Sequence, residues 1–262
     1  MIITDIDFAE LYREHMRRSG RPHKPASAWD ERAENMRRKP LRSAYSDAFI
    51  QGMNLSGANT LLDVGCGPGT ISLQLAAQLQ AVYGLDYSQV MLDCLMENAA
   101  QLELENVHPL RLAWEDDWSK VPVCDIAIAS RSSAVADIAA AIDKLNAHAR
   151  LRVYMTHLVG GHFVDPQIAA LLGREHEAFP DYIYIINILH RLGLHPQLSY
   201  IDIPSRLAGT ENFEAFSAKV SWTFGELNTD ELTALRNWYQ ADSLRAKRGG
   251  APMRWAFIAW EL

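Results

Sequence analysis

The chain has 262 residues, 48% apolar and 22% charged, and its 25 Lys and Arg against 32 Asp and Glu give a formal charge of −7. These totals are typical of globular proteins and exclude collagen-like, disordered and coiled-coil classes. Three cysteines without CxxC spacing argue against a disulfide framework or a zinc site, so no metal is expected.

Apolar periodicity and turn residues predict three helices at the start of the chain. They cover residues 8–18, a segment from about residue 27 to just before Pro40, and residues 43–53. From residue 60 the pattern becomes an alternation of short apolar runs and helical periods. Strands are expected at 60–64, 81–86, 107–113, 124–129 and 151–157, with helices from about 70, from 88 and over 136–149. Strands that alternate with helices predict a mostly parallel, doubly wound α/β sheet with helices on both faces.

The last part of the chain adds two more strands and a long connection between them. Helices are expected near 166–172 and over 181–192, and strands at 197–203 and 254–261. About 50 residues separate these two strands and hold two helical patterns, 211–219 and 229–240. That length exceeds an ordinary hairpin loop, so the insertion is interpreted as a cap or lid.

The charges are unevenly distributed along the chain. Residues 1–43 carry ten Lys and Arg and seven Asp and Glu, a net +3 that leaves −10 for the rest. Acids interleave with the basic residues, which favours solvated helix faces, and the acidic body would repel a phosphate backbone. Nucleic acid is therefore not expected as a partner. The lack of a basic leader and of an apolar run of ~18 residues predicts a cytoplasmic protein without a membrane partner.

A glycine-rich loop, Asp63-Val-Gly-Cys-Gly-Pro-Gly69, follows the first strand of the alternation. Its three glycines let the backbone turn sharply and approach a ligand closely. The dinucleotide fingerprint requires a glycine where this chain has Thr70, so GxGxG is the better description. Asp86 ends the next strand, where a carboxylate can accept hydrogen bonds from both ribose hydroxyls. The same features also suit a tight turn and a helix cap.

Residues 61–69 and the segment Tyr83-Gly-Leu-Asp-Tyr87 together resemble the first two motifs of class I S-adenosylmethionine-dependent methyltransferases of the small-molecule type. The resemblance covers about residues 58–203 and the last strand. It implies a Rossmann-like, seven-stranded fold, S-adenosylmethionine as cofactor and S-adenosylhomocysteine as product. It also places the loop near the methionine part of the cofactor, Asp86 on the ribose and Glu115 near the adenine. The cofactor-binding residues so assigned are Asp63, Gly65, Cys66, Gly67, Gly69, Asp86, Tyr87, Trp114, Glu115 and Ser130.

The acceptor is expected beyond the strand that ends at residue 129, because ligands of open α/β sheets bind at the carboxyl ends of the strands. Family members that methylate base amines carry an Asn/Asp-Pro-Pro-aromatic tetrad here, which this sequence lacks. Arg131 is a candidate to hold a substrate carboxylate and His157 a candidate base. Trp29 lies in a pattern found before the cofactor domain in small-molecule members. Each also has a plain structural interpretation, as an exposed arginine, a structural histidine and a packed helix residue.

The leading hypothesis is a methyltransferase for a small-molecule acceptor. In this interpretation one domain spans residues 1–262, with a helical cover at 1–57, the cofactor-binding core at 58–203, a helical insertion or lid at 204–253 and the last strand at 254–262. The catalytic residue is left unassigned, because in-line displacement can depend on alignment alone. The alternatives are methylation of RNA or protein, a non-catalytic module that binds S-adenosylmethionine, and a nicotinamide oxidoreductase.

Overall fold

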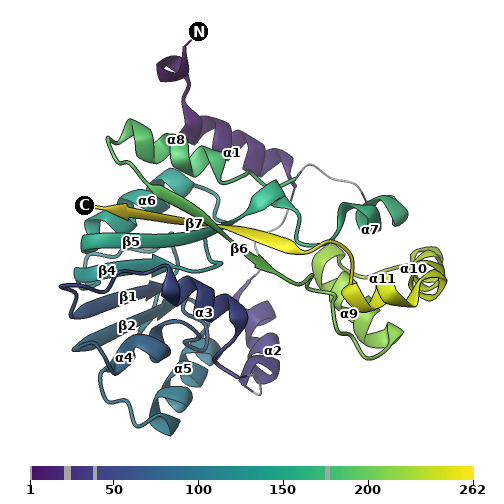
Figure 1. Ribbon diagram of the computed structural model, residues 1–262, viewed down its shortest axis with the longest axis horizontal. Coiled ribbons are helices and arrows are strands. Elements are labelled where there is room, and N and C mark those ends of the chain that lie inside the picture. The colour runs from purple at the N-terminus through teal and green to yellow at the C-terminus, as the bar shows by residue number, and fades with distance from the viewer. Residues whose placement is uncertain (1, 21–24, 38–39, 175–177) are drawn as a thin grey trace.

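The computed structural model describes residues 2–20, 25–37, 40–174 and 178–262. Its strands are β1 (Thr60–Val64), β2 (Ala81–Asp86), β3 (Val107–Arg111), β4 (Cys124–Ala129), β5 (Ala149–Leu158), β6 (Gln197–Ile203) and β7 (Met253–Glu261). They form one sheet in the order β3-β2-β1-β4-β5-β7-β6, shown in Figure 1. Neighbouring strands are parallel except at β7, which runs antiparallel to β5 and to β6. The predicted doubly wound, mostly parallel α/β fold with seven strands is confirmed.

The central strand β1 is buried because helices cover both faces of the sheet. Its last four residues are buried, as in a parallel strand that is apolar on both sides. Asp63 is the exception, a carboxyl group that is only 2% exposed. It lies level with Gly84 of β2 and Ile128 of β4, near the carboxyl end of the strand. A buried acid at this place needs a local reason, because burial disfavours its charged form.

Helices form one layer on each face of the sheet. One layer consists of α1 (Phe8–Arg18), α6 (Ile138–Ala147) and α8 (Ile183–Arg191). The other consists of α3 (Ala44–Gln51), α4 (Ser72–Ala76) and α5 (Gln89–Gln101). Figure 1 shows the two layers on opposite sides of the strands. The remaining N-terminal helix, α2 (Ala26–Arg37), packs against α5 and reaches the edge where the parallel strands end.

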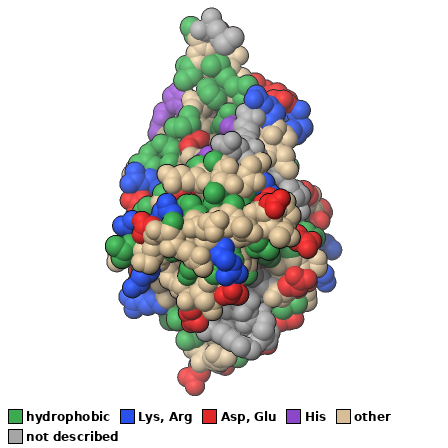
Figure 2. All heavy atoms as spheres, turned by 90° about the vertical axis from the view of Figure 1, so that its right-hand side faces the viewer, with side chains coloured by type: hydrophobic (Ala, Val, Ile, Leu, Met, Phe, Trp, Pro, Cys, Tyr) green, Lys and Arg blue, Asp and Glu red, His purple; other side chains and the backbone are tan. Residues whose placement is uncertain are grey.

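A helical lobe stands apart from the two layers, at the edge where the parallel strands end (Figure 1). It contains α7 (Pro166–Leu171), α9 (Phe213–Phe224), α10 (Thr229–Ala241) and α11 (Ser243–Arg248). These helices share a separate apolar core, built around Phe216 and Leu235, which are fully buried. On the face drawn in Figure 2, basic and acidic side chains are mixed rather than segregated.

Element boundaries mostly lie within a few residues of the predictions, but the helix expected over 211–219 runs on to Phe224. Ser88 caps α5 as predicted, since its hydroxyl accepts the Met91 N–H at 3.1 Å. The helix expected from residue 70 is only the five-residue α4, and α11, which Asp242 caps, was missed because six residues give too little periodicity. Two 3-10 turns, Ile3–Asp5 and Val159–Gly161, complete the regular structure. No helix in the described part of the chain is long and apolar enough to cross a membrane.

Candidate cofactor and acceptor site

The glycine loop turns directly beneath β2. The N–H groups of Gly65 and Cys66 donate to the Leu85 carbonyl at 2.7 and 3.1 Å. Gly65 has φ +70°, and a Cβ there would lie 2.4 Å from the Ser132 Cβ, so this position excludes any side chain. Gly67 also has positive φ, +53°, but nothing lies within 4 Å of where its Cβ would be. The loop is therefore packed at its first glycine and open at its second, where a ligand can approach the backbone.

Asp86 ties this loop to the start of α5. Its Oδ2 accepts the Gly67 N–H and its Oδ1 accepts the Ser88 N–H, both at 2.9 Å. Burial raises the pKa of the carboxyl, and these backbone donors oppose the shift. Each carboxylate oxygen has a second lone pair. The side chain thus shapes the loop and keeps capacity to accept hydrogen bonds from a ligand.

Asp63 lies behind the loop with an unusual protonation equilibrium. Burial raises its pKa from the ordinary 3.8 to about 7, and the negative charge of Asp86 adds to the shift. A carboxyl group with this pKa is partly neutral at physiological pH. A cationic ligand in front of the loop would favour its ionised form.

The adenine side of the predicted site is built by α2 and the residues after β2. Trp29 hydrogen-bonds the Tyr87 hydroxyl, and the Asp30 carboxylate accepts the Ser88 hydroxyl proton at 2.6 Å. Burial, with Asp86 nearby, raises the pKa of Tyr87 to about 12. Glu115 is exposed, and its charge acts on Tyr87. The structure therefore brings Trp29, Tyr87 and Glu115 together on the side predicted for the adenine.

The loop after β3 packs on the loop after β4. The Trp114 indole N–H donates to the Ser132 carbonyl at 3.1 Å, and the Ser132 hydroxyl donates to the Val64 carbonyl at 2.6 Å. Asp116 accepts the Ala113 N–H at 2.7 Å. The neighbouring Asp117 accepts from the Ser119 N–H and hydroxyl, as a turn cap does. Among the acids of this segment, Glu115 thus remains the candidate for the adenine.

Buried hydroxyl groups hold the start of the loop after β4. The Tyr45 hydroxyl lies 2.9 Å from the Ser130 Oγ and 2.7 Å from the Thr156 Oγ1. Thr156 Oγ1 also accepts the Arg131 N–H at 2.9 Å. Arg131 has φ +59°, a left-handed conformation that is rare outside glycine. Its guanidinium carbon lies 4.1 Å from the centroid of the Tyr45 ring.

His157 ends β5 with both ring nitrogens engaged. Its Nδ1 lies 2.8 Å from the Ser133 hydroxyl and its Nε2 lies 2.8 Å from the Pro180 carbonyl. Burial lowers the pKa of this imidazole, so it is neutral. The ring donates from Nε2 to the Pro180 carbonyl, while the Ser133 hydroxyl that faces Nδ1 also donates to the Thr156 carbonyl at 2.7 Å. His157 lines a narrow pocket beside Arg131, but both of its ring nitrogens face protein groups.

The cysteines and a second hollow lie outside this chemistry. Burial raises the pKa of the Cys66 thiol well above its ordinary value and that of Cys124 to about 11, so neither is a ready nucleophile.

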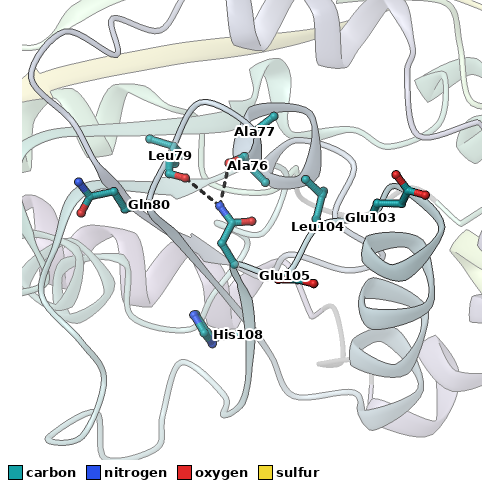
Figure 3. Close-up of a pocket in the computed structure, with 9 residues that line it drawn as sticks. Ala76, Ala77, Leu79, Gln80, Glu103, Leu104, Glu105 and His108 are labelled. Atoms are coloured by element: carbon teal, nitrogen blue, oxygen red, sulfur yellow. Dashed lines mark hydrogen bonds between the residues drawn. The ribbon is translucent and has the colours of Figure 1, made fainter.

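Nowhere in the described ranges do three His, Cys, Asp or Glu side chains gather to hold a metal ion. A hollow of about 490 Å³ lies where β2 and β3 begin, and its wall includes Gln80 and Asn106 (Figure 3). It is at the sheet edge opposite to the ends where ligands of such folds bind.

Sequence reasoning located the loop and the acids but missed the groups that position them. Tyr45, Asp30, Ser133 and Thr156 were not singled out. Tyr45 carries a weak signal, since it lies one helical turn before Phe49 on the apolar face of α3. Its hydroxyl partners are 85 and 111 residues away in sequence, so no local pattern reveals them.

The carboxyl groups and open backbone around the glycine loop suit a ligand with a cationic sulfonium and a ribose. Two carboxyl groups, Asp63 and Asp86, flank a loop whose backbone is open at Gly67. Negative charge beside the loop attracts a cation and would repel pyrophosphate. The geometry therefore fits S-adenosylmethionine better than a nicotinamide dinucleotide.

Comparisons with known proteins agree with this geometry. Residues 61–151 match a family described as a methyltransferase domain. An uncharacterized protein of Haemophilus influenzae is 38% identical over all of this chain and 99% of its own length. A putative methyltransferase of Bacillus halodurans has a similar fold, with a TM-score of 0.58, 10% identity and coverage of 84% of this chain and 99% of that one. Coclaurine N-methyltransferase, solved with N-methylheliamine and SAH, has a TM-score of 0.54 at 10% identity, covering 99% of this chain and 96% of that one.

The matched segment contains the glycine loop, Asp63 and Asp86, and the matched folds share the predicted sheet. The chain is thus an enzyme whose cofactor is S-adenosylmethionine. It belongs to the class I S-adenosylmethionine-dependent methyltransferases, in one family with the Haemophilus influenzae protein.

Proposed function

We propose that the protein transfers the methyl group of S-adenosylmethionine to a small-molecule acceptor. The observation that carries this proposal is the cover at the carboxyl edge of the sheet. The indole of Trp29, from α2, packs edge-on against that of Trp222, from α9, with ring centroids 5.9 Å apart. Helices α2 and α9 thus meet beside Tyr87, the residue proposed to lie near the adenine. A covered site favours a small acceptor over an RNA or protein chain.

In this proposal the bound S-adenosylmethionine supplies an electrophilic methyl group on a sulfonium sulfur. Gly67 offers its open backbone, Asp63 a carboxylate near the positive charge, and Asp86 hydrogen-bond acceptors for the ribose. Tyr87, Trp114, Glu115 and the backbone around Cys66, Gly69 and Ser130 complete the proposed contacts. The cover formed with α9 closes the proposed adenine side of the site.

The acceptor is proposed to react without a protein base. His157 is buried, with Nε2 bonded to the Pro180 carbonyl and Nδ1 in contact with the Ser133 hydroxyl. Burial raises the pKa of Tyr45, and its hydroxyl is engaged by Ser130 and Thr156. Neither group is free to remove a proton. Alignment and water exclusion therefore supply the rate enhancement, as is feasible for an in-line displacement.

The test separates the cofactor from the acceptor. Titration calorimetry with S-adenosylmethionine and S-adenosylhomocysteine should show binding of both. The protein is then incubated with S-adenosylmethionine that carries a radioactive methyl group and with three fractions of a bacterial extract: a small-molecule filtrate, total RNA and total protein. Label should enter the filtrate alone. Label in RNA or protein contradicts the small-molecule acceptor, and binding without any transfer indicates a non-catalytic module.

A further inference from the structure

The end of β4 holds an arginine whose charge no described carboxylate neutralises. The Arg131 side chain is exposed, and none of the ion pairs among the described residues includes it. Its guanidinium instead rests on the face of Tyr45. In a chain of net charge −7, a cation left unpaired at the ligand-binding edge of the sheet is available to an anion.

The backbone holds this arginine in one position. Its left-handed conformation is costly for a residue with a Cβ and persists only where the surroundings impose it, as they often do at functional sites. The Arg131 N–H is fixed by Thr156 Oγ1, which is in turn 2.7 Å from the buried Tyr45 hydroxyl. Three elements, α3, β4 and β5, therefore fix the position of the Arg131 backbone, from which the side chain extends.

An aromatic pocket adjoins the arginine. Its walls include Phe163, Phe179 and Trp255, with the Phe163 ring centroid 5.6 Å from that of Phe179 and 6.2 Å from that of Trp255. The enclosed space is about 10 Å³, room for about one water molecule. A ligand would therefore enter as the exposed Arg131 side chain, which lines the pocket, moves off the Tyr45 ring.

A buried donor without a partner lies in the same wall. Trp255 is 5% exposed, and within the described ranges its indole N–H has no hydrogen-bond acceptor. Buried polar groups in native structures are nearly always paired, so an orphaned donor calls for a reason. A polar atom of a ligand in the pocket would provide one.

We propose that this pocket binds a methyl acceptor that is a monocarboxylate on a planar apolar body. Arg131 pairs with the carboxylate, Phe163 and Phe179 hold the apolar body, and the Trp255 N–H donates to a second polar atom. A single cation in an acidic protein balances a carboxylate, whereas a phosphate dianion would leave excess negative charge. The inference rests on the proposed function, because it names the acceptor class for the same site.

A carboxylate could also come from the methionine part of the cofactor, so the first experiment distinguishes the two sources. Calorimetry compares S-adenosylhomocysteine with 5′-methylthioadenosine, which lacks the amino-acid part, on the wild type and on Arg131→Gln. We expect both affinities to be unchanged by the substitution. A loss of at least about tenfold for S-adenosylhomocysteine alone would assign Arg131 to the cofactor and overturn the proposal.

The second experiment probes the pocket with matched pairs of compounds. Phenylacetate and indole-3-acetate are compared with phenylacetamide and indole-3-acetamide, by ligand-detected NMR, with and without S-adenosylhomocysteine. The wild type should prefer each carboxylate by at least about tenfold, and Arg131→Gln should abolish the preference. No preference, or no binding of any probe, overturns the inference. A preference for phenyl phosphate over both carboxylates also overturns it.

Two further variants serve as control and as a test of the donor. Arg236 lies 4.1 Å from the Phe213 ring centroid in the lobe, the same distance as Arg131 from Tyr45, and pairs with Glu214, so Arg236→Gln should leave the carboxylate preference intact. Trp255→Phe keeps an aromatic ring and removes the N–H, so it should weaken a carboxylate probe with a second acceptor, 4-methoxyphenylacetate, several-fold, and leave phenylacetate unchanged. Unchanged affinity for 4-methoxyphenylacetate in Trp255→Phe contradicts the donor role. If the wild type does not bind S-adenosylhomocysteine, the proposed function is overturned. The pocket proposal is judged separately, because probe binding is also measured without S-adenosylhomocysteine.

Discussion

The indoles of Trp29 and Trp222 meet edge to face, with an interplanar angle of 73°, although 193 positions separate them in the chain. This contact joins the N-terminal helices to the lobe. Trp29 also hydrogen-bonds Tyr87, so the pair couples the cover to the predicted adenine side.

Removing either ring of this pair should weaken cofactor retention. Aromatic pairs contribute about 0.5–1.5 kcal/mol beyond burial, so Trp29→Ala and Trp222→Ala should each raise the Kd of S-adenosylhomocysteine about two- to tenfold. Calorimetry on both variants and on the double variant measures the coupling. Fully additive effects of the two substitutions would show that the rings act independently. Trp238→Ala, inside the lobe core, controls for a general loss of lobe packing.

The raised pKa of Asp63 predicts a pH dependence of cofactor binding. The folded protein binds a proton between about pH 4 and 7 that the unfolded chain has released, so stability without ligand falls as pH rises through this range. A cationic ligand prefers the ionised carboxyl, so affinity for S-adenosylmethionine should increase about tenfold from about pH 6 to 8. Calorimetry between these pH values measures the change in affinity. Asp63→Asn should flatten the profile, and an unchanged slope in that variant would remove Asp63 from the explanation.

Substituting Asp86 should cost binding more than stability. Asp86→Ala frees the Gly67 and Ser88 N–H groups and removes the proposed ribose acceptor, so we expect S-adenosylhomocysteine to bind at least about tenfold more weakly. Asp86→Asn keeps one acceptor oxygen, so its Kd should lie between those of the wild type and Asp86→Ala. Asp117→Ala, which removes a turn cap at an exposed site, should leave the Kd unchanged. Wild-type affinity in Asp86→Ala would show that the ribose is held elsewhere.

The first two glycines of the loop should respond differently to the same substitution. Gly65→Ala places a methyl group against Ser132 and should destabilise the fold by about 2–4 kcal/mol in urea unfolding. Gly67→Ala meets no protein atom and carries only the conformational cost of about 1–2 kcal/mol, yet it fills the face left open for a ligand. Its Kd for S-adenosylhomocysteine should rise at least about tenfold. Normal binding by Gly67→Ala would mean that the ligand does not approach there.

The ion pair inside the lobe predicts acid sensitivity of that part of the protein. Arg174 donates to both carboxylate oxygens of Glu231, and its guanidinium holds the pKa of this group below the ordinary 4.5. The contribution to stability is therefore present above about pH 4.5 and is lost as pH falls through the lowered pKa. Hydrogen exchange of α10 should be faster in Glu231→Gln at neutral pH. The exposed pair Arg254–Asp202 provides the control, since Asp202→Asn should change little.

Local patterns were sufficient for the sheet and for the acids beside it. β1, β2 and β4 have the predicted bounds because buried parallel strands are short apolar runs between turns. Asp86 was found because it ends such a run, and Asp63 because it opens the glycine-loop motif. The groups that hold the Arg131 backbone could not be found in this way, since Tyr45 and Thr156 meet only through the packing of α3 on the sheet. The partners of His157 were likewise hidden, because the Pro180 carbonyl carries no side-chain signal.

The lobe core unites residues from two stretches of the chain, with α8 and β6 between them. Ile168 of α7 packs with Phe216 and Leu235 of the later helices. Excising residues 204–253 would leave α7 with an uncovered apolar face. The same segment inserted into another protein would lack α7 and could not complete the lobe core. Chimeras with other methyltransferases should therefore exchange both stretches together.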